Sequence, residues 1–307
     1  MILHQFPDLQ WLKQKAEQRF DDKQGWEGRQ LKREGWPNVI LNVNAQNIYR
    51  DNIKGPLSLF MNISGESTVL ADKRRVNIKG GYFFITNHDQ YYTLEVEKHK
   101  AETFNIHFGE HFTENIFLSL TSDYESLLDE GDSSQLKRIE FYNKLHPRTP
   151  AVNHILTQIK QADNNALLLE EKLVDLITLL VSDHREVKKA QRNLPSIKRS
   201  TKHEVVRRLF FATDYIYSFY HLDLTLDELA KVACLSKFHF LRLFKLLFHK
   251  TPHQFINEVR AEKAKELLQG SELEVQAIAK SVGFRDSSSF SRMFYQQVGV
   301  YPSQYRH

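Results

Sequence analysis

The first third of the chain alternates short apolar runs with turn residues. Between residues 38 and 108 the runs are broken at Ser64-Gly65, Lys79-Gly80-Gly81 and Asn87-His88-Asp89, which contain residue types that favour turns. Short runs at such regular spacing predict an antiparallel β-barrel or sandwich. The expected strands are Val39–Val43, Leu57–Ile63, Thr68–Ala71, Val76–Ile78, Tyr82–Thr86, Tyr91–Glu97 and Ala101–Phe108.

After this region, apolar residues recur at helical spacing. Residues 151–162 and 164–190 each predict a helix, and residues 5–24 predict a shorter amphipathic one. One face of the 164–190 helix is apolar enough to pack on the barrel or on a second copy of the chain, and the pattern does not choose between them. Residues 191–200 are rich in small polar and charged side chains and predict a linker.

An internal repeat occupies the last third of the chain, whose pattern is helical throughout. The matched positions are Phe240-x-Arg242-x-Phe244 with Pro252-x-Gln254-Phe255 and, fifty residues later, Phe290-x-Arg292-x-Phe294 with Pro302-x-Gln304-Tyr305. Upstream, Ala230 and Cys234 match Ala279 and Gly283 at an offset of forty-nine. Because a proline and an arginine are among the matches, we interpret the repeat as a duplicated structural unit.

The first copy has the pattern of a helix-turn-helix motif. Thr225 and Glu228 form a capping box that begins one helix. Cys234 lies in the expected turn, and Ser236 is a suitable N-cap for a second helix that ends near residue 248.

The second copy follows the same scheme, with Gly283 in the turn and Asp286 at the N-cap. Between the copies, residues 252–270 predict one helix about 28 Å long. That length is close to the ~34 Å between successive major-groove faces of B-DNA. The spacing predicts two recognition helices held about one helical turn apart on one side of a duplex.

Composition and charge agree with a two-part protein. The length of 307 residues suggests two domains. Residues 201–307 hold 15 Lys+Arg against 11 Asp+Glu, whereas residues 1–200 hold 27 of each. The excess positive charge therefore lies in the repeat, as in a module that binds a polyanion.

A single cysteine, Cys234, excludes an internal disulfide. With no long apolar run and no secretory signal, we expect a soluble cytoplasmic protein.

The repeat resembles the AraC/XylS family of transcription regulators. The residues that carry the resemblance are Ile278-Ala279, Gly283-Phe284, Ser289-Phe290-Ser291-Arg292-Met293-Phe294, Gly299, Pro302 and Tyr305-Arg306. The likeness is strong over residues 201–307 and weak over residues 38–108, where many members carry a cupin-like barrel that senses an effector. It implies a mixed α and β protein: a cupin-like barrel with helices over 1–190 for effector binding and dimerisation, a linker over 191–200, and a bipartite helix-turn-helix domain over 201–307.

The resemblance also implies partners and contact residues. The partners are double-stranded DNA, a small-molecule effector of unknown identity and a second copy of the chain bound through residues 164–190. RNA polymerase is a further candidate, and no interaction with a membrane is expected.

By position, the groove-facing residues are Phe238, Leu241 and Arg242 in the first unit and Ser287, Ser288, Ser291 and Arg292 in the second; Lys237 and Lys245 add positive charge on the same helix face as the first three. Arginine pairs with guanine or phosphate. Phe238 and Leu241 are expected on thymine methyl groups, unless one of them packs internally. Tyr295 replaces the lysine that members often carry after the second phenylalanine, which leaves one backbone contact in doubt.

Candidate effector contacts are Asn62, His88 and Tyr92, which bring polar groups to barrel strands or a strand end. Each also fits a purely structural role. The alternation over residues 57–63 leaves open whether the odd-numbered or the even-numbered side chains line the interior.

Two features of the sequence bear on catalytic chemistry. His107-x-x-Glu110-His111 matches a zinc-peptidase pattern that needs both histidines on one helix. Here residues 103–108 alternate like a strand and Gly109 breaks the run, so we expect exposed histidines at a strand end. No His-x-His occurs, which favours a pocket without a metal, no cofactor and no enzymatic activity. The alternatives are an effector-independent DNA-binding protein whose barrel only dimerises, and a metal-dependent cupin enzyme with an appended DNA-binding domain.

Overall fold

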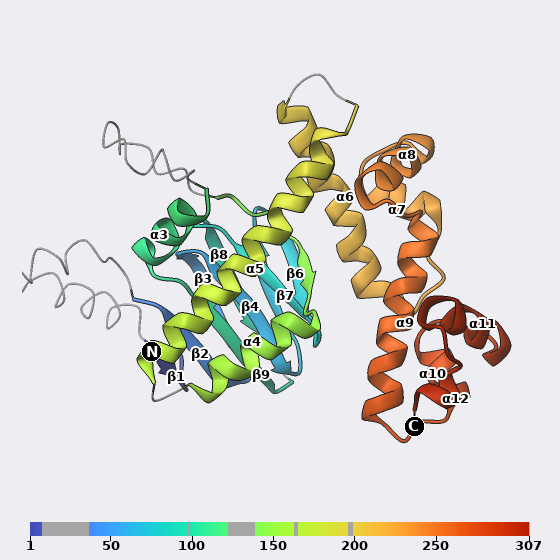
Figure 1. Ribbon diagram of the computed structural model, residues 1–307, viewed down its shortest axis with the longest axis horizontal. Coiled ribbons are helices and arrows are strands. Elements are labelled where there is room, and N and C mark those ends of the chain that lie inside the picture. Colours follow the sequence, from blue (N-terminus) through green and yellow to red (C-terminus); the bar gives the residue numbers. More distant parts are fainter. Residues whose placement is uncertain (8–36, 98, 122–138, 163–164, 196–198, 307) are drawn as a thin grey trace, which may run out of the picture. The chain divides into compact units, whose positions relative to one another are not determined.

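The structure is a computed structural model that describes the chain except for residues 8–36, 98, 122–138, 163–164, 196–198 and 307. Two units are distinguished, Met1–Arg185 and Glu186–His307 (Figure 1). Most of the helix expected over residues 5–24 falls outside the described residues, and so does the middle of the expected linker. No helix among the described residues is long and apolar enough to cross a bilayer.

Ten strands of the described N-terminal unit form two sheets. Every predicted strand overlaps an observed one. Three observed strands were not predicted: the short β1 and β10, and β3, whose apolar positions are interrupted by charged residues. The six-stranded sheet has the order β1 (Ile2–Leu3), β2 (Val39–Ala45), β9 (Ala101–His107), β4 (Ser58–Ser64), β7 (Tyr82–Thr86) and β10 (Leu145–Pro147). The four-stranded sheet has the order β3 (Ile48–Lys54), β8 (Tyr91–Val96), β5 (Ser67–Ala71) and β6 (Arg74–Ile78).

The expected closed barrel is not confirmed. Among the described strands, hydrogen bonding leaves β1 and β10 at the edges of one sheet and β3 and β6 at the edges of the other. Pairing is antiparallel except between β1 and β2. The predictions of a sheet-rich N-terminal region and a helical C-terminal region are confirmed.

The two faces of β4 have different environments, which answers the question left open by its alternation. Leu59 and Met61 are completely buried in the cluster that contains the helices of this unit. Phe60 points to the other face, where its ring lies 4.8 Å from that of Tyr92 on β8. The even-numbered side chains therefore face the space between the sheets.

Three helices lie among the described residues of the N-terminal unit: α3 (Glu110–Thr121), α4 (Pro150–Gln161) and most of α5 (Ala166–Arg192). In Figure 1, α4 and α5 lie across the six-stranded sheet. The inward stripe of α5, with Leu173, Leu176 and Ile177, is fully buried against that sheet. Removal of this apolar surface from water stabilises the unit. The inward face of the helix is thus occupied by its own sheet.

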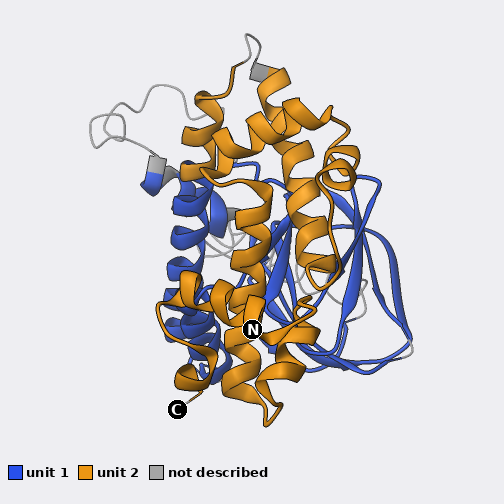
Figure 2. Cartoon of the chain, turned by 90° about the vertical axis from the view of Figure 1, so that its right-hand side faces the viewer, with its two compact units in different colours: residues 1–185 blue, residues 186–307 orange. Residues whose placement is uncertain are grey.

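The described residues of the C-terminal unit are helical (Figure 2). The elements are α6 (Arg199–Phe219), α7 (Leu226–Val232), α8 (Lys237–Phe248), α9 (Pro252–Gly270), α10 (Val275–Ser281), α11 (Ser287–Val298) and α12 (Pro302–Tyr305). The helices predicted for both copies of the repeat and for the connecting segment are confirmed. In Figure 1, α9 extends from the α7–α8 pair to the α10–α11 pair.

The two turns use the same backbone conformation with different residues. Cys234 follows α7 with a φ of 50°, and Gly283 follows α10 with a φ of 94°. Both values lie in the left-handed region, which side chains disfavour. The repeat therefore extends to backbone geometry, with glycine in one copy and cysteine in the other.

Replacing Thr225 by alanine should lower the free energy of unfolding by about 1 kcal/mol, because Thr225 Oγ1 accepts a hydrogen bond from the Glu228 backbone N–H at 3.2 Å. Ser236→Ala is the matched control, since the Ser236 side chain forms no capping hydrogen bond on α8; its expected effect is less than about 0.5 kcal/mol. Urea denaturation of the full chain measures both. Equal losses would contradict the assignment of the two caps.

Candidate nucleic-acid interface and ligand pocket

The second helix of each repeat copy has an apolar back. In α8 the buried residues are Phe240, Leu243, Phe244 and Leu247, and in α11 they are Phe290, Met293 and Phe294. At about 100° per residue, the position between two such phenylalanines lies on the opposite side of the helix. Arg242 and Arg292 occupy these positions and are exposed.

The front of α8 carries the residues singled out from sequence. Phe238 is 86% exposed, an unusual state for so large an apolar ring, while Leu241 is half-buried. Arg242 and Lys245 are exposed. Lys237 is also exposed, but its ammonium lies 2.7 Å from the Asp227 carboxylate on α7. Lys237 therefore forms an exposed ion pair between the two helices of the motif.

The front of α11 is smaller and more polar. Ser287, Ser288 and Arg292 are exposed, and Ser291 is half-buried. Asp286 begins the helix, and its Oδ1 accepts a hydrogen bond from the Ser289 backbone N–H at 2.7 Å. This hydrogen bond lowers the pKa of the Asp286 carboxyl. The predicted N-cap of α11 is confirmed.

The two motifs are joined by more than the α9 helix. Arg260, in the middle of α9, donates hydrogen bonds to the carbonyl oxygens of Tyr220 and Leu222, both at 2.8 Å, in the loop before α7. Its guanidinium also lies 5.1 Å from the centre of the Phe284 ring, at the turn of the second motif. Arg260 thus links the entry to the first motif with the turn of the second.

Gly283 permits this arrangement. A Cβ at this position would lie 2.7 Å from the carbonyl oxygen of His221, closer than side chains approach in real structures. The loop before α7 therefore packs directly against the turn between α10 and α11. Sequence reasoning assigned Gly283 to the turn but missed its second role and missed Arg260, whose partners are distant backbone atoms.

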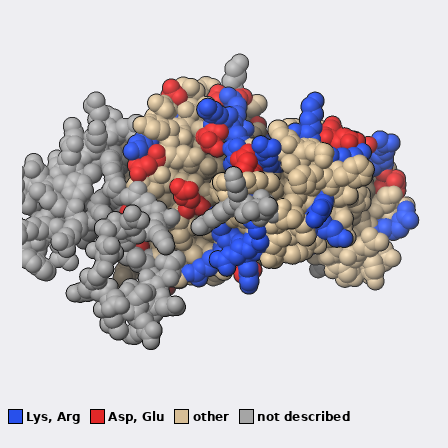
Figure 3. All heavy atoms as spheres, turned by 90° about the horizontal axis from the view of Figure 1, so that it is seen from above, with Lys and Arg blue, Asp and Glu red and all other residues tan. Residues whose placement is uncertain are grey.

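Charge is distributed less simply than the composition indicates. On the face drawn in Figure 3, basic side chains are interspersed with acidic ones rather than collected in one patch. Several basic residues of α9 form ion pairs, including Lys263 with Glu266 and Lys265 with Glu262, both at 2.8 Å. The exposed arginines of the recognition helices are better indicators of a contact surface than the net charge.

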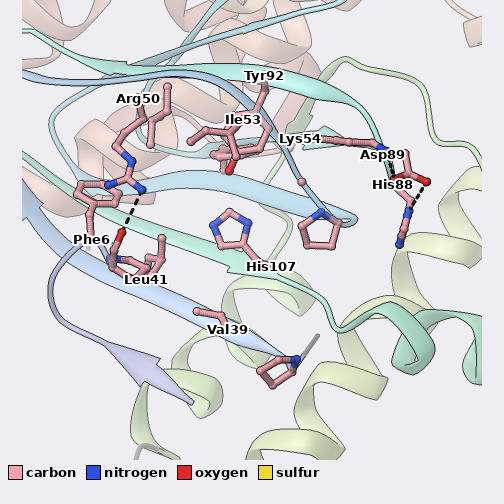
Figure 4. Close-up of a pocket in the computed structure, with 16 residues that line it drawn as sticks. Phe6, Val39, Leu41, Arg50, Ile53, Lys54, His88, Asp89, Tyr92 and His107 are labelled. Atoms are coloured by element: carbon pink, nitrogen blue, oxygen red, sulfur yellow. Dashed lines mark hydrogen bonds and ion pairs between the residues drawn. The ribbon is translucent and has the colours of Figure 1, made fainter. Parts of the chain in front are cut away.

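A pocket of about 240 Å³ lies in the N-terminal unit between the two sheets (Figure 4). Its walls are largely apolar, and its polar side chains come from β3, β8, β9 and the turn between β7 and β8. The lining residues are Phe6, Pro7, Pro37, Val39, Leu41, Arg50, Ile53, Lys54, Gly55, Pro56, Phe60, His88, Asp89, Tyr92, Leu94 and His107. Mostly apolar walls with few polar groups are typical of ligand sites.

Two of the three predicted effector contacts line this pocket. Tyr92 extends into its centre, whereas His88 lies at one side, with its Nδ1 3.1 Å from the Asp89 carboxylate (Figure 4). Asn62 is not among the lining residues. Its Nδ2 donates hydrogen bonds to Ser67 Oγ at 3.0 Å and to the Ile78 carbonyl oxygen at 2.7 Å, so it joins β4 to the other sheet.

His107 is a pocket residue, and the expectation of an exposed histidine at this strand end was wrong for it. It is the last residue of β9, and its ring faces the space between the sheets because Ile106 and Phe108 face the opposite, fully buried side. Its Nδ1 lies 2.8 Å from Ser58 Oγ. Burial lowers the pKa of His107 to about 4, so the ring is neutral at pH 7.

The geometry does not support a zinc-peptidase pattern at residues 107–111. His107 ends β9, whereas α3 begins only at Glu110, so the two histidines do not share a helix. Within the described part of the chain, no group of three or more His, Cys, Asp or Glu side chains could hold a metal ion.

Comparison with known proteins agrees with the geometry of the C-terminal unit. Residues 229–307 match the family model described as "Helix-turn-helix domain". The chain is 38% identical over 92 residues to the MmsAB operon regulatory protein of Pseudomonas aeruginosa, covering 30% of each protein. It is 30% identical over 166 residues to the probable transcriptional regulator LumQ of Photobacterium leiognathi, covering 49% of this chain and 66% of LumQ. The C-terminal part of the chain is a helix-turn-helix domain of the AraC type.

One solved structure that resembles the chain is the C-terminal domain of AraT, a response regulator from Geobacillus stearothermophilus. The sequence identity is 33%, the match covers 32% of this chain and 83% of that one, and the TM-score is 0.32. The matched part of the chain spans less than two thirds of the first curated relatives, and for the MmsAB operon regulator it spans under a third.

Replacing Arg260 by methionine should lower the free energy of unfolding by about 1–2 kcal/mol, because two backbone carbonyl groups, one of them partly buried, lose a charged hydrogen-bond donor. Arg285→Ala is the control: Arg285 lies near the same loop, but its side chain is 92% exposed and it contacts Asp223 at 3.4 Å only. Urea denaturation compares the two. If Arg260→Met lowers the free energy of unfolding no more than Arg285→Ala does, the hydrogen bonds of Arg260 do not stabilise the domain.

The stability of the chain should fall as the pH is lowered from about 6.5 to about 4, because the unfolded chain protonates His107 in this range and the folded chain does not. The contribution of the neutral His107 to the free energy of unfolding is fully present above pH 6.5 and is at most about 3 kcal/mol. His107→Gln should have a shallower pH dependence. Since His146 also has a lowered pKa, the measurement is the difference between variant and wild type at each pH, and a constant difference would contradict the prediction.

Proposed function

We propose that this protein is a DNA-binding transcription regulator of the AraC type that recognises a bipartite site. The observation that carries the proposal is the duplicated helix-turn-helix motif, in which each recognition helix buries a phenylalanine back and exposes an arginine. A helix of this size fits the major groove of B-DNA. The relatives named above as an operon regulator and a probable transcriptional regulator support this function.

The residues in the proposed interface have different tasks. Arg242 and Arg292 pair with guanine or with phosphate, and the hydroxyl groups of Ser287, Ser288 and Ser291 contact bases or phosphates. Phe238, exposed without an apolar neighbour to cover it, contacts thymine methyl groups, and Leu241 is half-covered and contributes less. Lys245 adds a phosphate contact, and Lys237 holds α8 to α7 through Asp227 while remaining near the duplex.

In this proposal residues 1–190 form an effector-binding and dimerisation domain related to the cupins, 191–200 a linker and 201–307 the DNA-binding domain. The effector occupies the pocket between the two sheets, at Tyr92 and His88. A ligand changes the DNA-binding state only if it binds one arrangement of the chain more tightly than another. Because the inward face of α5 is covered by its own sheet, dimerisation through residues 164–190 uses the outward face, where Leu167 is 80% exposed.

Replacing Arg292 by alanine should weaken binding to a duplex selected from a random pool by about 1–3 kcal/mol and relax the preference at one base pair, because a bidentate contact to guanine is lost. Gel-shift titration with the selected duplex and its single-base variants provides the measurement. Arg75→Ala is the control, an exposed arginine on a strand of the N-terminal unit. Unchanged affinity and unchanged base preference for Arg292→Ala would refute this contact.

A further inference from the structure

Three polar side chains line the pocket, each from a different strand. Arg50 comes from β3, Tyr92 from β8 and His107 from β9. In Figure 4 the Tyr92 hydroxyl points toward the His107 ring, and the Arg50 guanidinium lies to one side of them, next to the Phe6 ring. Burial raises the pKa of Tyr92 to about 12 and lowers that of His107 to about 4; the positive charge of Arg50 opposes the first shift and adds to the second, so it lies within electrostatic range of both groups. These groups can contact one small ligand simultaneously.

The hydrogen bonds of His107 define what it offers to a ligand. The Ser58 hydroxyl donates its single proton to the Pro56 carbonyl oxygen at 2.9 Å. Ser58 Oγ therefore accepts from His107, whose Nδ1 lies 2.8 Å away and carries the ring proton. The ring is neutral at pH 7, so its Nε2 has a lone pair and no proton. His107 therefore presents a hydrogen-bond acceptor, which matches an O–H or N–H donor of a ligand.

Arg50 provides the opposite kind of group. Its Nη2 donates to the Pro7 carbonyl oxygen at 3.1 Å, and its guanidinium lies 5.6 Å from the centre of the Phe6 ring. No described carboxylate forms an ion pair with Arg50, whereas the other lining cation, Lys54, is 2.9 Å from Asp89. The Phe6 side of the pocket therefore holds a positive charge with further N–H donors, and a planar carboxylate is a group that the arginine fork pairs with well.

We propose that the pocket binds a small hydroxylated carboxylate. Its carboxylate pairs with the Arg50 guanidinium and accepts a hydrogen bond from the Tyr92 hydroxyl, and its own hydroxyl donates to His107 Nε2. The apolar part of the ligand packs against Phe60, Leu94 and the other apolar walls. The pocket, of about 240 Å³, has room for a compact acid with a short apolar part. The proposal rests on the proposed function only in treating this ligand as the effector.

Titration calorimetry on the full chain tests the ligand class with two probes, mandelate and 3-hydroxybutyrate. Each is compared with its uncharged amide, mandelamide or 3-hydroxybutyramide, and with the acid that lacks the hydroxyl, phenylacetate or butyrate. We expect at least one hydroxy acid to bind, with both of its comparators at least tenfold weaker. Absence of binding by both hydroxy acids at millimolar concentration would overturn the proposal, and so would equal binding of the amide or of the acid without the hydroxyl.

Variants assign the contacts. Arg50→Met should abolish binding of the hydroxy acid, whereas Arg75→Met, on the opposite edge strand of the same sheet and outside the pocket, should leave it unchanged. His107→Phe should remove the preference for the hydroxy acid over its deoxy counterpart. If Arg50→Met does not fold, Arg50→Lys replaces it in the test, because lysine keeps the positive charge but lacks the planar guanidinium. We expect Arg50→Lys to weaken binding of the hydroxy acid severalfold and to keep the preference for the acid over its amide. Full binding by a folded Arg50→Met would overturn the assignment.

The same samples separate this proposal from the proposed function. DNA binding is measured by gel shift with a duplex selected from a random pool. Specific DNA binding together with no hydroxy-acid binding would overturn the ligand class alone. Hydroxy-acid binding by a chain that selects no DNA sequence would overturn the proposed function and leave the ligand class standing.

Discussion

The burial of phenylalanines on one side of each recognition helix is the constraint on which the proposed interface depends. Phe240 and Phe244 are completely buried, as are Phe290 and Phe294. Because residues four apart lie on one face of a helix and the residue midway between them lies about 200° from the first, the core fixes the direction of each arginine. Exposure of these two arginines follows from the hydrophobic effect rather than from any contact that they make themselves.

The relative placement of the two motifs depends on backbone contacts as well as on α9. Gly283 lets the loop before α7 approach the turn of the second motif, and Arg260 bridges the same two segments. A helix alone fixes a distance, whereas a second connection also restricts rotation about the helix axis. In a protein that contacts two major-groove segments, that restriction determines the spacing and the register of the two half-sites. In the N-terminal unit, pairing across the sheets likewise places Arg50, Tyr92 and His107 around one pocket.

The C-terminal domain was predictable from sequence because its information is local and repeated. Capping residues, turn residues and the spacing of phenylalanine and arginine all lie within a few residues of one another, and α8 and α9 begin and end where the pattern predicts. Arg260 escaped prediction because its partners are backbone carbonyl oxygens forty and thirty-eight residues away, which no side-chain pattern marks. The pocket was harder still, because it assembles side chains from strands that are distant in the sequence. Tyr92 and His88 were expected there for their polar groups, His107 was expected to be exposed, and β3 with Arg50 was not recognised as a strand.

The most direct test of the account is methylation interference on a duplex selected from a random pool by the full chain. Two arginines in two major-groove segments predict two groups of guanines whose methylation blocks binding, separated by about 10 base pairs and lying on one face of the duplex. Loss of the first group with Arg242→Ala and of the second with Arg292→Ala would assign each motif to its segment. A single group of guanines, or a pool from which no sequence is enriched, would contradict a bipartite contact.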